Sequence, residues 1–444
     1  MHAAGSLARA CLVGCILLTG CRPVPGDPDA QSAVQDRTPV PTGLPATPPE
    51  PHPQVTFTDL TVVPGVEPGV WLVLGLARND SRYTLEAVVT TVEVLDLAGT
   101  PTAAATVPVA LSILQPAATS PFLARFEQAG APESARAQLQ AFRFSSEAPV
   151  RVSMEAVHSS RSSEGTLVLG RLRNMEPRSA RAREVVVVWR EADRSLAGMA
   201  AASVPQALVP EDGTVPWMAE APGALLGSRV EVYAAVSAVD ESPDVPLESV
   251  LGPTWRVTSQ GRGFVVGTLR NSGHDPALPE VAIAIIAGGR LVSLEILQST
   301  VPLPPGETLD YGADRFPGLD AAVDSADGVT LELYLTGRLM APDAPSAIPL
   351  PASIQQFEVI GSHVFMQGTV TNPGPAPLKS AMVLVSLRST TGEIQTARWL
   401  DLTPPPPGES AGFSIDVPVA AGDDPAMSEY DLRAVGIPLS ETSW

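Results

Sequence analysis

Residues that could perform acid–base or metal chemistry are few and scattered. Beyond residue 20 the chain has four histidines, each in a different region: His52, His158, His274 and His363. Zinc sites usually take two histidines from one short motif such as His-Glu-x-x-His, and no such pairing occurs. A phosphate-binding glycine loop is also absent from the sequence. The sequence therefore predicts a protein that is not an enzyme and that uses no cofactor or metal.

Carboxylates are more abundant and offer one alternative chemistry. The loop-rich stretch from 310 to 326 carries four of them: Asp310, Asp314, Asp320 and Asp324. Calcium could bridge such oxygens and relieve their mutual repulsion. A solvated acidic loop needs no ligand and accounts for the same residues, so we expect no calcium site. The net charge of −20 repels phosphate backbones, which excludes nucleic acid as a partner.

The three cysteines all lie at the N-terminus, at Cys11, Cys15 and Cys21. The remaining residues therefore cannot form a disulfide or a thiolate metal site. An apolar run from Ala10 to Leu18 follows Arg9 and is about half the ~20 residues of a membrane-spanning helix. The stretch Leu18-Thr19-Gly20-Cys21 resembles the lipobox of bacterial lipoproteins, which implies cleavage after residue 20 and a lipid on Cys21. An ordinary secretory signal or a short buried helix are the alternatives.

Residues 21–54 should form a lipidated, proline-rich tether. Residues 22 to 54 include ten prolines and one leucine, too little apolar surface to offset the entropy of ordering. At ~3.1 Å per residue in the polyproline conformation, the segment could span on the order of 100 Å. We expect a disordered linker that lifts the rest of the chain off a membrane.

A five-residue phrase then recurs at domain-sized intervals. It reads GLARN, GRLRN, GTLRN and GTVTN, and its first and last residues are Gly75 and Asn79, Gly170 and Asn174, Gly267 and Asn271, and Gly368 and Asn372. We interpret the phrase as scaffold, because a turn needed by every domain explains four copies better than a site does. The glycine permits close packing or a bulge at a strand end. The asparagine amide can bond nearby backbone groups or tolerate a left-handed φ, and its loss should cost about 1–2 kcal/mol. In the third copy, Val266 and Leu269 are the expected core residues.

The other features of each copy follow in the same order. An alternating segment comes next, as at Val185, Val187 and Trp189, and period 2 indicates a strand with one buried face. Glycines at the following turn include Gly99, Gly288 and Gly392, with Gly198 a looser match. A Pro-Gly turn follows, and an aromatic residue stands six or seven positions after its prolines: Phe122, Trp217, Tyr311 and Phe413.

Units of about 100 residues with about seven strands and no long helix are typical of immunoglobulin-like antiparallel β-sandwiches. We therefore expect an all-β chain with four tandem β-sandwich domains after a signal peptide (residues 1–20) and the disordered tether. The domains are placed at residues 55–146, 147–244, 245–342 and 343–444. The phrase, the alternating strand and the Pro-Gly turn also resemble FxLYD-type repeats of bacterial envelope lipoproteins, and this resemblance implies a non-catalytic extracytoplasmic module.

Function is predicted at the level of a class. We expect a lipid-anchored protein on the extracytoplasmic side of a bacterial cell membrane, with a structural or interaction role and an envelope protein or glycan as partner. A ligand-binding surface module for carbohydrate or protein is the first alternative, and a hydrolase accessory protein the second. Trp399 and Trp444 are candidates for a contact surface.

Overall fold

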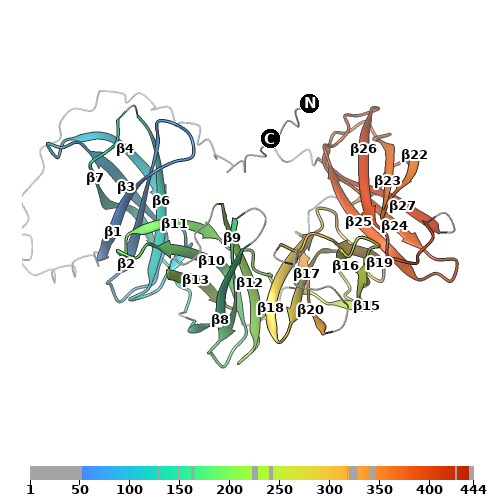
Figure 1. The fold of residues 1–444 in the computed structure, drawn as a ribbon, viewed down its shortest axis with the longest axis horizontal. Coiled ribbons are helices and arrows are strands. Elements are labelled where there is room, and N and C mark those ends of the chain that lie inside the picture. The colour runs from blue at the N-terminus through green and yellow to red at the C-terminus, as the bar shows by residue number, and fades with distance from the viewer. Residues whose placement is uncertain are drawn as a thin grey trace, which may run out of the picture. The chain divides into compact units, whose positions relative to one another are not determined.

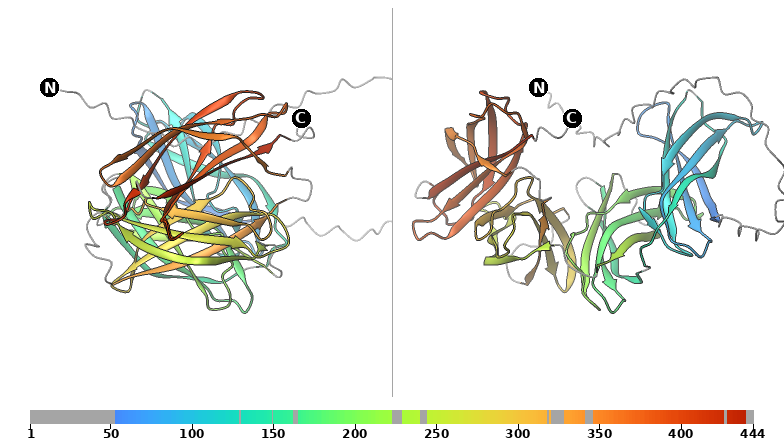
Figure 2. Two further views of the ribbon diagram at one scale, coloured as in Figure 1. Left: turned by 90° about the vertical axis from the view of Figure 1, so that its right-hand side faces the viewer. Right: turned by 180° about the vertical axis from the view of Figure 1, so that it is seen from behind.

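The computed structural model describes residues 53–439, with gaps at 129, 149, 162–164, 223–228, 240–243, 318, 320–327, 341–345 and 426–427. Within this part of the chain there is no α-helix, and strands account for most residues (Figure 1). The predicted signal peptide, Cys21, His52 and Trp444 lie outside the described residues. The same strand-only architecture is visible from two further directions in Figure 2.

Four domains follow one another, and each is built from six main strands in the same order. In the first domain these are β1 (Val55–Pro64), β2 (Val70–Asn79), β3 (Leu85–Leu95), β4 (Pro101–Pro108), β6 (Thr119–Glu127) and β7 (Ser134–Phe144). In the second domain they are β8 (Val152–Arg161), β9 (Gly165–Asn174), β10 (Ala180–Arg190), β11 (Leu196–Ala201), β12 (Thr214–Pro222) and β13 (Arg229–Ala238).

The third domain has β15 (Leu247–Val257), β16 (Gly263–Asn271), β17 (Ala277–Ala287), β18 (Arg290–Gln298), β19 (Thr308–Ala313) and β20 (Val329–Leu339). The fourth has β22 (Ala352–Ile360), β23 (His363–Thr371), β24 (Leu378–Arg388), β25 (Ile394–Leu402), β26 (Ser410–Pro418) and β27 (Glu429–Pro438). Three two-residue strands, β5 (Ile113–Leu114), β14 (Asp244–Val245) and β21 (Ile348–Pro349), add short pairings. Strand β14 spans the predicted boundary between the second and third domains and pairs with β20.

Every domain divides its six strands between two antiparallel sheets. The first, second and fifth strands form one, here named the 1-2-5 sheet, as in the order β1-β2-β6. The fourth, third and sixth form the other, the 4-3-6 sheet, as in β11-β10-β13. With the two-residue strands included, the first, third and fourth domains have the expected seven strands, and the second has six among its described residues. The six main strands are mostly longer than expected. The fold is all-β, with four tandem antiparallel β-sandwiches.

The sandwich core lies between the two sheets and follows the predicted alternation. In the second domain Val185, Val187 and Trp189 of β10 are buried against Val168 and Trp217 of the opposite sheet. The turns after the third strand also follow the prediction in three domains, since Gly99, Gly289 and Gly392 have positive φ. In the second domain the turn residue is Arg194 (φ 75°), and Gly198 lies inside β11. The prediction of a turn near Gly198 was therefore displaced by four residues.

Candidate functional site

The phrase asparagines lie at the ends of the second strands and are completely buried. Asn271 Nδ2 donates to the carbonyl oxygens of Asp275 (2.9 Å) and Leu303 (2.8 Å), and its Oδ1 accepts from the Gly273 backbone N–H (2.9 Å). The other three make the same set. Their Nδ2 atoms donate to carbonyl oxygens of Tyr83 and Leu114, Arg178 and Val209, and Ala376 and Pro405, and their Oδ1 atoms accept from Ser81, Glu176 and Gly374.

The asparagine backbone fixes the second sequence landmark, the Pro-Gly turn. Asn271 N–H donates to the Glu307 carbonyl (3.1 Å), and Gly306 N–H donates to the Asn271 carbonyl (2.8 Å). Gly408 and Glu409 make the same pair of bonds with Asn372. Each asparagine therefore joins the end of the second strand, the loop after it and the turn before the fifth strand.

The phrase glycines are sites of close packing. Gly267 lies opposite Tyr311 in the register of β16 and β19, and a Cβ built on Gly267 would meet the Tyr311 Oη at 2.3 Å. The three equivalent pairs are Gly75 with Phe122, Gly170 with Trp217 and Gly368 with Phe413, at 2.4 to 2.5 Å. The aromatic residues that follow the Pro-Gly turns thus pack on the glycines of the phrase.

Two roles were predicted for the asparagine, hydrogen bonding to nearby backbone groups and a left-handed φ, and the structure shows the first. No phrase asparagine is among the described residues with positive φ. Leu269 is buried in the core of the third domain, as expected. Val266 is also buried, but on the opposite face of the sheet, against Ile394, Ala397 and Ala420 of the fourth domain.

Val266 belongs to a recurring contact between successive domains. Residues five positions before the phrase asparagines are Leu74, Leu169 and Val266 in the first three domains, and all are buried on the outer face of the 1-2-5 sheet. Each packs on the 4-3-6 sheet of the following domain. The facing residues include Val188 and Leu196, then Ala282 and Ala284, then Ile394 and Ala397.

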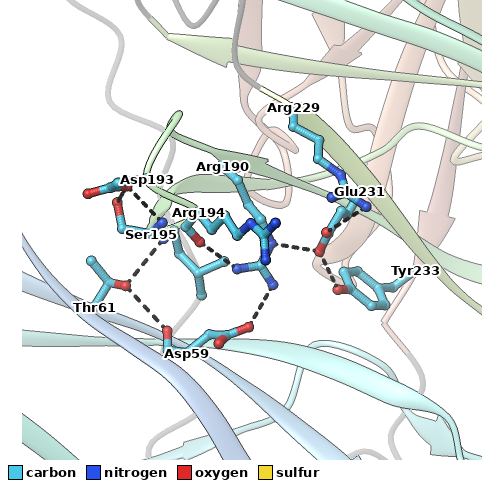
Figure 3. A network of polar contacts seen from close by, with 10 residues as sticks. Asp59, Thr61, Arg190, Asp193, Arg194, Ser195, Arg229, Glu231 and Tyr233 are labelled. Atoms are coloured by element: carbon cyan, nitrogen blue, oxygen red, sulfur yellow. Dashed lines mark hydrogen bonds and ion pairs between the residues drawn. The ribbon is translucent and has the colours of Figure 1, made fainter.

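A buried arginine holds the first of these contacts (Figure 3). Arg190 ends β10 of the second domain, and its side chain is 9% exposed. Its Nη2 donates to Asp59 Oδ2 of the first domain (2.7 Å), and its Nη1 donates to the Arg194 carbonyl (2.8 Å). Its Nε forms an ion pair with Glu231 (2.8 Å). Thr61 Oγ1 accepts the Leu196 backbone N–H (3.2 Å), so the bulged part of β1 is joined to the second domain twice.

The same arginine clamp recurs between the third and fourth domains. Arg190 and Arg388 both lie 16 residues after their phrase asparagine (174 + 16 = 190; 372 + 16 = 388). Arg388 Nη1 donates to the Gly392 carbonyl four residues on, and its Nη2 donates to Asp310 of the third domain. Trp399 Nε1 donates to the Asp310 carbonyl (2.6 Å), so this tryptophan lies in an interdomain contact.

Between the second and third domains the arginine belongs to the preceding domain and not to the following one. Arg171 of β9 donates from Nη2 to both carboxylate oxygens of Glu332 (2.8 Å each). Tyr334 Oη donates to Glu332 (2.9 Å), and Tyr233 Oη donates in the same way to Glu231 beside Arg190 (2.9 Å). A Glu-x-Tyr pair on the sixth strand therefore supports the arginine in both interfaces.

The local electrostatics suit a permanent ion pair. Burial raises the pKa of Glu231, but hydrogen bonds from Arg190 and Tyr233 lower it more, so the net pKa lies below its ordinary value. Burial, followed by the bond to Glu231, raises the pKa of Tyr233 to about 12. Glu231 is therefore charged and Tyr233 neutral at pH 7, the states in which these hydrogen bonds form.

Residues considered for catalysis or metal binding are not brought together. His158 Nδ1 lies 3.0 Å from the Ala156 carbonyl and His363 Nδ1 lies 2.9 Å from Asp416. Asp310 and Asp314 bond with arginines, and Asp320 and Asp324 lie outside the described residues. No group of three potential metal ligands occurs in the described part of the chain.

One Gly-x-Ser-x-Gly stretch occurs, from Gly408 to Gly412, so the expectation that this motif is absent is wrong. In hydrolases this motif forms a sharp turn between a strand and a helix. Here Ser410 begins strand β26, and its Oγ is 2.7 Å from Thr371 Oγ1. The stretch belongs to the Pro-Gly turn that Asn372 fixes, and no helix follows it.

The clearest groove lies between the third and fourth domains. It has a volume of about 240 Å³, and Leu303 and Leu309 line it from one domain and Met382 and Val435 from the other. Arg433 and Glu307 provide its charged groups. No aromatic side chain contributes to it, which suits an aliphatic group better than a sugar ring.

Known proteins offer little guidance. No family model and no curated protein matches the chain. Among solved structures it is similar to dimeric latent PorU from Porphyromonas gingivalis, with 11% identity over 66% of this chain and 34% of that one and a TM-score of 0.15. It is also similar to the BSP domain of a biofilm-associated protein, with 8% identity over 88% and 96% of the two chains and a TM-score of 0.13. Both TM-scores are too low to carry an argument. Across the described residues, no helix has the length and apolarity needed to cross a bilayer.

Proposed function

We propose that this chain is a lipid-anchored extracytoplasmic protein with a structural or interaction role, which presents four coupled β-sandwiches at a bacterial cell envelope. The observation that carries the proposal is the repeated interdomain contact. Apolar residues and arginine ion pairs join each domain to the next, and such joints hold neighbouring surfaces in one orientation. A protein that displays surfaces to a partner benefits from this coupling, because less orientational freedom is lost on binding.

The anchor and address rest on the sequence, through Leu18-Thr19-Gly20-Cys21 and the proline-rich residues that follow. The likeness to FxLYD-type envelope lipoproteins rests on the phrase and the Pro-Gly turn. Both features agree with a module held at a membrane surface by an extended tether. An envelope protein or a glycan is the proposed partner.

The anchor is tested by replacing Cys21 with Ser in producing cells that are fed a labelled fatty acid. The wild-type chain should take up the label and sediment with membranes, and the variant should lose both properties. Cys15→Ser is the matched control, because it changes a cysteine outside the lipobox. A wild-type chain without label, together with a variant that stays on the membrane, would disprove lipid anchoring.

A ligand-binding module is the second candidate, and the groove between the third and fourth domains favours it. Its aliphatic lining suits a small apolar ligand. The fluorescence of anilinonaphthalene sulfonate should rise on binding there and fall when Met382→Trp fills the space. Equal fluorescence with both proteins would remove the groove from consideration.

A further inference from the structure

The fourth domain has an exposed apolar margin along its first strand. Strand β22 is an edge strand, paired only with β23 among the described residues. Its last four residues include Phe357, Val359 and Ile360, which are 38%, 48% and 59% exposed. Phe357 and Val359 lie opposite the buried Met366 and Val364, so they face the space between the two sheets.

The opposite side of this margin is β27. The short strand β21 pairs with Val435 and Gly436, and the Leu350 N–H donates to the Ala434 carbonyl, so within the described chain the outer edge of β27 is unpaired from Glu429 to Arg433. Tyr430, at the start of β27, is 55% exposed. Its ring centroid is 6.4 Å from that of Phe357, with an interplanar angle of 32°. Two strand edges with free backbone groups thus flank an exposed pair of aromatic rings.

The equivalent margins of the first and third domains are closed. Trp255 of the third domain occupies the position that Phe357 occupies in the fourth, because each lies opposite the residue six positions before the phrase asparagine of its own domain. The Trp255 ring packs on that of Phe316, with the centroids 5.9 Å apart. In the first domain, the first strand is bulged at Asp59 and bonds to Arg190 of the following domain. The register of β22 shifts between Ile354 and Gln356, before its exposed apolar residues, and the strand has neither an internal proline nor a residue with positive φ to disrupt pairing.

We propose that this margin of the fourth domain, between β22 and β27, binds an extended segment of a partner protein as an added β-strand. The strand edges supply backbone hydrogen bonds, and Phe357, Val359 and Tyr430 contact apolar side chains on alternate residues of the incoming segment. Glu358, Glu429 and Asp431 lie on the same two strands, and the only basic residue there, Arg433, is paired with Asp431. This charge favours a segment with arginine or lysine between its apolar residues.

The proposal rests on the interaction role above, for which it names the class of partner. It is tested with the purified chain and an array of ten-residue peptides that carry valine at alternate positions, with arginine or glutamate between. Fluorescence anisotropy then gives the dissociation constant of the best peptide. The arginine series should bind, and a version with proline at the positions that donate to the strand edge should bind at least tenfold more weakly.

Val359→Lys should weaken binding at least tenfold, whereas Val250→Lys, at an exposed valine of β15 in the third domain, should leave it unchanged. Removing residues 440–444 should not reduce the affinity. Absence of binding by every peptide, or equal binding by both lysine variants, would overturn the proposal. Self-association of the chain that Val359→Lys abolishes would also overturn it, because a second copy would then be the occupant. The test needs no membrane, so its result is independent of lipid anchoring.

Discussion

Asparagine occurs four times in the 444 residues, and every copy is the last residue of the repeated phrase. Each side chain is fully buried and makes at least three hydrogen bonds to backbone groups. No other side chain supplies two donors and an acceptor in this shape, since aspartate lacks the donors and glutamine is longer. This restricted use of asparagine shows at the level of single residues why the phrase serves as scaffold.

Asn271→Ala should lower the free energy of unfolding of the third domain by about 3 kcal/mol, more than the ~1–2 kcal/mol expected from the sequence, because three hydrogen bonds are lost at about 1 kcal/mol each. Asn271→Asp should cost more, since a carboxylate would face the carbonyls of Asp275 and Leu303. Thermal and urea unfolding of the full chain would measure both, with the neighbouring Ser272→Ala as control. A cost within 0.5 kcal/mol of that control would contradict the scaffold role.

Glu295 provides a test at a second residue. Burial raises its pKa to about 8, while the backbone N–H of Arg315 and the charge of Arg398 act in the opposite direction. The folded chain therefore keeps a proton that the unfolded chain releases above its ordinary pKa of about 4.3. The contribution of Glu295 to the free energy of unfolding should therefore decrease as the pH rises from about 4.5 to about 8, and it should stay constant above that pH.

Glu295→Gln removes this titration and keeps the acceptor for Arg315. The melting temperature of Glu295→Gln relative to the wild type should rise from pH 5 to pH 8. Glu307→Gln, at an exposed carboxylate, is the matched control. A constant difference across the range would mean that Glu295 titrates normally.

At the scale of strands, the phrase glycine and the aromatic residue form one packing unit. Gly267→Ala would place a methyl group against Tyr311 and should cost about 1–3 kcal/mol through overpacking. Tyr311→Phe removes the atom nearest to that methyl group, so the double variant should lose less than the sum of the two single costs. A double-mutant cycle measures the coupling. Additive costs would show that the pair is not in contact.

The strands and the order of landmarks could be predicted from the sequence, because period 2 and the Pro-Gly turns are local signals. The interdomain contacts could not, since each joins residues from different copies. In β10, Val185, Val187 and Trp189 were read as the buried face, but Val186 and Val188 are buried too. The preceding domain covers the outer face of this sheet, and the uninterrupted run of valines was the available signal. The sequence also contained a signal for the arginine clamps. Only in the second and fourth copies does an arginine stand 16 residues after the phrase asparagine.

At the scale of the whole molecule, the outer face of the 1-2-5 sheet of the fourth domain differs from those of the first three domains, because it is polar at the contact position. The position five before the phrase asparagine is apolar and buried in three domains, but in the fourth it is Gln367, which is exposed. The outer face of the last 1-2-5 sheet is therefore suited to water, and the apolar margin beside it is the exception that suggests a partner.

Fixed orientation of successive domains is the central claim, and electron–electron distance measurement tests it most directly. Spin labels would replace the exposed Thr106 of β4 and Ser159 of β8 through cysteines, in a chain that starts after Cys21 and so has no other thiol. A single narrow distance distribution is expected, and it should broaden in Arg190→Gln because the ion pairs with Asp59 and Glu231 are lost. A distribution that is already broad with Arg190 in place would contradict it.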